Sequence, residues 1–270
     1  MRDLSRRWAW LGVLVVGLLL YILVLRTLIR TQNPNFVPSL ILLGATVVPL
    51  AFLTFAQART GRWQVPGSAL VTSAFFGGVI GVVVAGRLEY DTLRGLGALP
   101  LLIVAIIEEA AKMIVPVVLL FTVLARHERR LPSDGLIIGV ASGMGFAALE
   151  TMGYAFTALL ASKGQIAAVQ ETLFVRGLTA PAGHTAWTGL TCGALWAFFA
   201  ATDRRGRKFL AFIATFIGAV ILHTCWDTFG GILPFVILGF ISLGWLFLAL
   251  HRYKAFADMS TRGLPRRLTV

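Results

Sequence analysis

Long runs of apolar residues, separated by short segments that carry most of the charges, divide the chain into eight pieces. Each run is about long enough, or longer than needed, for an α-helix to cross about 30 Å of hydrocarbon, which takes ~20 residues. We therefore expect an all-α polytopic membrane protein with about eight transmembrane helices. The predicted helices cover residues 8–25, 37–56, 68–86, 98–125, 135–161, 181–202, 209–230 and 232–250.

The composition agrees with this pattern. Of the 270 residues, 57% are hydrophobic and 13% are charged, and the mean hydropathy is +0.83. A soluble domain carries about 25% charged residues, so the chain is too apolar for that class. Because the longest external segment, 162–180, is too short for a soluble domain, we expect residues 1–270 to form a single membrane domain. Its motif-bearing core is 98–230, and a basic cytoplasmic tail follows at 253–270.

The net charge of +12 is distributed over the segments between the apolar runs. Such a distribution reflects membrane topology, so we expect the lipid bilayer and no nucleic acid as a partner. With a cytoplasmic N-terminus, 17 Lys and Arg residues lie inside and 6 outside, and Lys112 completes the 24. The positive-inside rule therefore predicts that both termini are cytoplasmic in a multi-pass protein of the cell membrane.

The fourth apolar run contains three charged residues, Glu108, Glu109 and Lys112. Each charge at such a depth costs about 2.5–3.5 kcal/mol on insertion scales, so we expect these residues to have partners or a task. On a helix, Lys112 lies four residues from Glu108 and three from Glu109, and can neutralise either carboxylate. Glu109 and Lys112 form a structural ion pair, or Glu109 belongs to the catalytic group; both interpretations stay open.

Three other runs contribute ionisable residues at a similar depth. Glu150 lies about as far from the outer end of the fifth run as Glu108 does in the fourth, and His184 opens the sixth. In the seventh, His223 and Asp227 are four residues apart and share a helix face, where a carboxylate can orient an imidazole. Counted from the helix ends, these residues gather in the extracytoplasmic half of the bilayer. We therefore expect one site there.

Four motifs on successive helices resemble those of a known family, the PrsW intramembrane proteases, which are relatives of the CAAX prenyl endopeptidases and the bacteriocin-processing proteins. The resemblance implies cleavage of a membrane-anchored protein substrate, such as an anti-sigma factor, near the outer face of the cell membrane. In the wider superfamily a histidine stands in place of Glu150 and an asparagine in place of Asp227. The motifs are Glu108-Glu109-Ala110-Ala111-Lys112, Phe146 to Glu150, His184 to Thr188 and His223 to Asp227.

Two versions of peptide hydrolysis fit these residues, because the reaction needs an activated water and a donor for the oxyanion. In the metal-free version, Glu108 is the general base and Glu150 or His184 helps to hold the water. His223, fixed by Asp227, then donates to the oxyanion. This version therefore needs no cofactor.

In the second version, His184, His223 and Glu150 ligate Zn²⁺, and Glu108 deprotonates the bound water. Because no His-Glu-x-x-His pair fixes two ligands on one helix, we favour the metal-free version. The catalytic candidates across both versions are Glu108, Glu109, Glu150, His184, His223 and Asp227.

Two functions without proteolysis also fit a small polytopic protein with buried ionisable residues. One is a proton-coupled transporter or channel. We find no internal repeat relating the two halves of the chain, which disfavours it. The other is a catalytically silent membrane scaffold. Replacing His184 and His223 separates the classes, because a protease would lose cleavage and a scaffold would keep its partner.

Overall fold

The computed structural model describes residues 2–60, 65–122 and 131–261, and every regular element within these ranges is helical. The expectation of an all-α fold is confirmed. In chain order the elements are α1 (Arg2–Thr31), η1 (Pro34–Phe36), α2 (Val37–Arg59), α3 (Gly67–Leu96), α4 (Leu101–Phe121), α5 (Pro132–Ala161), α6 (Ile166–Thr179), η3 (Ala180–Ala182), α7 (His184–Phe199), α8 (Arg205–Thr228) and α9 (Ile232–Thr261).

Six of the described helices are long and apolar enough to cross a membrane, judged by length and composition: α1, α2, α3, α5, α8 and α9. Their large apolar side chains are often exposed, as for Ile232 and Phe240, which suits contact with lipid. The protein is therefore a polytopic membrane protein. Helix α4 carries three charges and α7 has 16 residues, so their span character stays a prediction.

Helix α5 is the central element of the fold. It packs against α2, α3, α4, α6 and α7. Its glycines bring the neighbouring backbones close, because a Cβ on Gly145 would collide with the Ala74 carbonyl of α3, and a Cβ on Gly143 with the His184 carbonyl of α7. Ser142 of α5 also donates a hydrogen bond to the Lys112 carbonyl of α4 at 2.7 Å. These contacts fix the two helices that carry Lys112 and His184.

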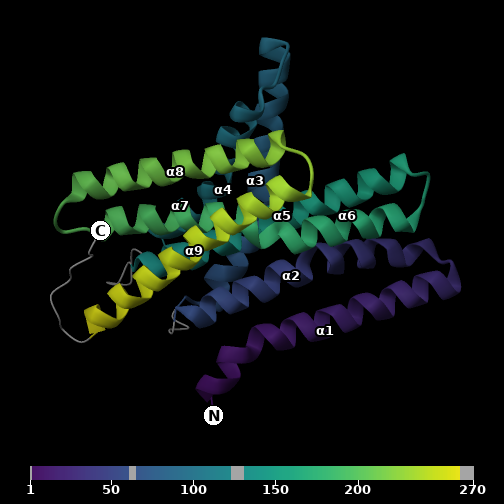
Figure 1. Ribbon diagram of the computed structural model, residues 1–270, viewed down its shortest axis with the longest axis horizontal. Helices are drawn as coiled ribbons and strands as arrows, with labels where there is room; N and C mark the ends of the chain where they lie inside the picture. The colour runs from purple at the N-terminus through teal and green to yellow at the C-terminus, as the bar shows by residue number, and fades with distance from the viewer. Residues whose placement is uncertain (1, 61–64, 123–130, 262–270) are drawn as a thin grey trace.

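Helices α3 and α4 form a hairpin that runs across the other helices (Figure 1). Its turn is set by Gly97, which has a φ of 68° and ends α3, and by Pro100, which precedes the first residue of α4. The predicted helix 98–125 therefore begins three residues later, at Leu101, because Pro100 is extended; residues 123–125 lie outside the described part.

Residues 162–180 were predicted to form a loop outside the membrane; the loop is wrong because the segment contains a helix, and its external position stays a prediction. They contain α6, whose buried Val169, Leu173 and Gly177 repeat every four residues on one face. A Cβ on Gly44 of α2 would lie 2.8 Å from Leu173, so α2 and α6 pack closely. Polar residues such as Glu171 lower the mean hydropathy of the segment. It therefore has no long apolar run, and the helix was not predicted.

Helix α6 and helix α7 follow each other along α5 and are separated by η3 (Figure 1). Pro181 lies in this break, where its missing N–H removes no helical hydrogen bond. The predicted helix 181–202 accordingly begins at His184. At the C-terminus, α9 extends to Thr261, so the predicted tail 253–270 starts as helix; residues 262–270 lie outside the described part.

Candidate active site

A cluster of buried charged residues forms where α4 meets α5, α7 and α8. Helix α4 supplies Glu108, Glu109 and Lys112 on one face, and all three are buried. The Lys112 side chain is 0% exposed and the Glu109 side chain 1%. Charges at such burial persist only when they are paired, and the neighbouring helices supply the partners.

The Lys112 ammonium group is the centre of this cluster. It donates to Glu109 Oε1 at 2.7 Å and lies 3.3 Å from Glu108 Oε2 and 2.6 Å from His184 Nδ1. It also stands 4.3 Å from the centre of the Phe146 ring, a cation–π distance. The sequence left open whether Lys112 pairs with one carboxylate, and the structure shows that it contacts both.

The two histidines each contact a carboxylate. His184 Nε2 lies 2.9 Å from Glu150 Oε2 on α5, and His223 Nδ1 lies 3.0 Å from Glu109 Oε1 on α4. The ring centres of the two histidines are 4.9 Å apart. His223 Nε2 is 3.3 Å from Asp227 Oδ2, as expected from their spacing of four residues. The predicted catalytic candidates therefore lie together.

Trp187 of α7 covers the histidines from one side. Its ring stacks on His223 with ring centres 5.0 Å apart, and its Nε1 donates to Ser242 Oγ of α9 at 2.9 Å. Trp226 packs edge-on against it at 6.0 Å. The aromatic residues next to the two histidine motifs thus form one wall of the site and hold its imidazoles in place.

Arg176 on α6 belongs to the cluster but was missed from the sequence. Its Nη2 donates to Glu150 Oε2 at 2.6 Å. It was counted among the basic residues of an external loop because α6 was not predicted. The period of Val169, Leu173 and Gly177 would have revealed the helix, but no motif marks Arg176 itself.

Of the described residues, Glu108, His184 and His223 form a group that could hold a metal ion. Their donor atoms all lie within 4.8 Å of one another. Two imidazoles and one carboxylate are a usual donor set for catalytic zinc. The buried Glu108 Oε2 accepts no hydrogen bond from the described residues, and the cation next to it is the Lys112 ammonium at 3.3 Å. Glu108, and not Glu150 as the sequence suggested, joins the histidines in this group.

The charge balance also fits a divalent cation. Four carboxylates and two basic groups take part in the contacts, so the net formal charge is −2 when both imidazoles are neutral. Uncompensated charge in a buried site is costly, and a divalent cation would bring the balance to zero. The carboxylates are Glu108, Glu109, Glu150 and Asp227, and the basic groups are Lys112 and Arg176.

Residues 34–251 match the sequence model described as PrsW family intramembrane metalloprotease. The chain belongs to the PrsW family. The match extends well beyond the region 98–230 that carries the motifs. No curated protein and no solved structure matches the chain.

Membership of the PrsW family bears on the functional class. It identifies the chain as a member of an intramembrane metalloprotease family. The family is described as a metalloprotease family, which goes against the metal-free version that we favoured from the sequence. The geometry of Glu108, His184 and His223 agrees with the family description.

A small cavity reaches the site of this PrsW-family protein between α6, α7 and α8. Its volume is about 100 Å³, and its lining includes His184, Arg176, Trp187 and Trp226. The cavity therefore reaches two members of the cluster, His184 and Arg176.

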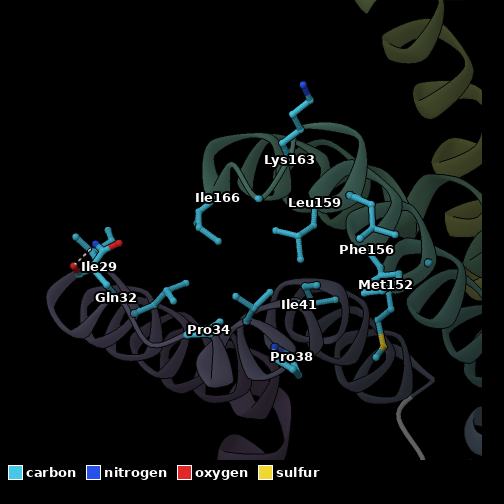
Figure 2. A pocket seen from close by; sticks show the side chains of 15 residues that line it. Ile29, Gln32, Pro34, Pro38, Ile41, Met152, Phe156, Leu159, Lys163 and Ile166 are labelled. Carbon is cyan, nitrogen blue, oxygen red and sulfur yellow. Dashed lines mark hydrogen bonds between the residues drawn. The ribbon is translucent and has the colours of Figure 1, made fainter.

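A much larger cavity of about 1000 Å³ lies between the ends of α1, α2, α5 and α6. Figure 2 shows Met152 and Phe156 of α5 facing Pro34, Pro38 and Ile41 across it. The Lys163 side chain points away from it, and Gln32 Nε2 donates to the Ile29 carbonyl. None of the charged cluster lines this cavity, so its size does not make it the site of chemistry.

Proposed function

We propose that this PrsW-family protease hydrolyses a peptide bond of a membrane-anchored protein, using Zn²⁺ held by Glu108, His184 and His223. The observation that carries the proposal is the convergence of these three donors from α4, α7 and α8 to within 4.8 Å. Charged residues within an apolar helix such as α4 are costly to insert into a membrane and are usually functional. The family membership supports proteolysis as their function.

The remaining carboxylates orient the two imidazoles. An ionised carboxylate can only accept, so Glu150 receives the Nε2 proton of His184, and its Nδ1 lone pair faces the Lys112 ammonium at 2.6 Å. His184 Nδ1 would bind the metal in place of this contact. In the same way Glu109 receives the Nδ1 proton of His223, and the atom that would bind the metal is Nε2, which lies 3.6 Å from Glu108 Oε2 and 3.3 Å from Asp227 Oδ2. Carboxylate–histidine pairs of this kind fix the tautomer of metal-binding imidazoles. Glu109 and Glu150 therefore act behind the ligands.

The residues of the cluster have different roles in the hydrolytic step. Zinc, when bound, lowers the pKa of a coordinated water and polarises the substrate carbonyl. Lys112 holds Glu108 and Glu109 in place through its ammonium group. Asp227 has the most exposed side chain of the four carboxylates, at 32%, and stands beside His223 Nε2. We assign it the acceptance of the proton from the attacking water.

We further propose that the site lies in the extracytoplasmic half of the cell membrane, with both termini cytoplasmic. The excess of Lys and Arg in the predicted inside segments supports this orientation. The substrate would then be a membrane-anchored protein cut near its outer end, as in the first processing step of an anti-sigma factor.

The test compares cells that make the wild-type protein with cells that make Glu108→Gln. Membranes from both are profiled for protein N-termini by mass spectrometry. We expect new N-termini at or next to the outer ends of single-span membrane proteins in the wild type alone. Identical profiles, with equal amounts of both proteins in the membrane, would contradict the proposed proteolysis.

A further inference from the structure

Arg176 holds the carboxylate that faces His184. Its Nη2 and His184 Nε2 both approach Glu150 Oε2, at 2.6 Å and 2.9 Å. One oxygen atom therefore receives two donors from two different helices, α6 and α7. The position of this oxygen, and with it the direction of the His184 ring, depends on both contacts.

The guanidinium group is itself fixed to α5. Arg176 Nε donates to Thr151 Oγ1 at 3.4 Å, and the guanidinium carbon lies 4.0 Å from the centre of the Tyr154 ring. A planar guanidinium that stacks on an aromatic ring and donates in its own plane has little freedom left. Arg176 is thus a rigid support for Glu150 and is not a mobile surface residue.

We propose that Arg176 is a positioning residue of the metal site, acting on His184 through Glu150. The inference rests on the proposed function, because it treats His184 as a zinc ligand. Without the guanidinium, Glu150 would lose a charge-assisted hydrogen bond and its compensating charge, and the imidazole would lose its fixed acceptor. Helix α6 then places the Arg176 side chain against α5.

The experiment is a titration of purified, chelator-stripped protein with Zn²⁺ alone. The variants are Arg176→Gln, Arg176→Lys, Glu150→Gln and the double variant Arg176→Gln/Glu150→Gln. Loss of an outer-shell partner weakens metal binding about 10- to 100-fold, so we expect about a tenfold loss for Arg176→Gln. Arg176→Lys, which keeps the charge but not the planar guanidinium, should restore only part of it. In the double variant, the Arg176 change should add nothing to the loss from Glu150→Gln.

The matched control is Arg87→Gln, which breaks the exposed Arg87–Asp91 pair of 3.9 Å on α3. It should bind Zn²⁺ like the wild type. If Arg176→Gln does not fold, Tyr154→Leu replaces it, since it removes the stacking surface and keeps the arginine; we expect a loss of about threefold, below the range for a direct partner.

Three results would overturn the inference. They are wild-type affinity in Arg176→Gln, additive losses in the double variant, or wild-type affinity in Tyr154→Leu where that variant is needed. Each leaves the proposed function standing if the wild type binds Zn²⁺. A wild type that binds no Zn²⁺ would instead overturn the zinc site and this inference together.

Discussion

The ammonium group of Lys112 lies among acidic groups with no exposure to solvent. It balances Glu108 and Glu109, which would otherwise be two like charges on adjacent residues of one helix. Removing one partner of a buried ion pair costs more than the pair contributes, because the other charge is left without compensation. Lys112 is therefore needed for the stability of the site, in addition to any role in the reaction.

Replacing Lys112 by Met should lower the free energy of unfolding by about 3–5 kcal/mol, the usual cost of leaving a buried charge unpaired. The measurement is thermal unfolding in detergent, compared with Lys163→Met at an exposed position. Adding Glu109→Gln to Lys112→Met should recover part of the loss. A Lys112→Met protein as stable as the Lys163→Met control would show that the ammonium is not needed for charge balance.

Glu108→Gln should abolish cleavage and also lower the zinc content. The amide is a poor zinc ligand compared with a carboxylate, so the affinity should fall together with activity. Metal analysis of the purified variant separates the two roles considered for Glu108. A protein that keeps its full zinc content but no longer cleaves would make Glu108 the base and not a ligand.

The sequence predicted the members of the site better than their roles. Glu108, Glu150, His184 and His223 stood out because ionisable groups in apolar runs are costly. Glu109 Oε1 lies 3.0 Å from His223 Nδ1 and 3.8 Å from His184 Nδ1, whereas Glu108 joins the two histidines only in the possible metal-binding group. This arrangement depends on how α4 is rotated against α7 and α8, and spacing along one helix does not contain that information. Among the described residues the group that could hold a metal ion contains Glu108, whereas the sequence suggested Glu150; the roles of both stay predictions.

At the scale of elements, the site depends on the close packing of α5 with α7. Gly143 lies against the backbone of His184, so a side chain there would push away the helix that carries this histidine. A Gly143→Ala change should cost about 1–3 kcal/mol of stability, as overpacking does, and should weaken Zn²⁺ binding.

Gly153 offers a control on the same helix, because a Cβ there would meet nothing within 4 Å. Gly153→Ala should leave Zn²⁺ binding unchanged and raise the helix propensity. Zinc titration and thermal unfolding of both variants test the point. Equal behaviour of the two alanine variants would show that the α5–α7 contact does not position His184.

The helices most easily predicted were those with uniform apolar runs, such as α2 and α5. Helix α6 escaped prediction because its apolar face is narrow and its mean hydropathy modest, although its period of four is regular. The break between α6 and α7 was indicated by Pro181, but the position of α7 beside α5 follows from glycine contacts that only the packed structure reveals.

At the scale of the whole molecule, the orientation in the membrane is a prediction from charge. A green fluorescent protein fused after residue 270 should fluoresce, because it stays in the cytoplasm, and an alkaline phosphatase fused there should be inactive. A cysteine placed at Lys163 in the α5–α6 connection should react with an impermeant thiol reagent from outside. The opposite pattern would place the site in the cytoplasmic half.

The proposed hydrolysis requires that Glu108, His184 and His223 bind one catalytic zinc ion. Its most direct test is elemental analysis of the purified wild-type protein, together with His223→Ala, combined with a cleavage assay before and after chelation. We predict about one zinc per chain in the wild type, a large loss in His223→Ala, and cleavage that stops on chelation and returns with Zn²⁺, as for other three-ligand sites. A wild-type protein that contains no metal and cleaves equally well with chelator would rule out a catalytic zinc ion at these residues.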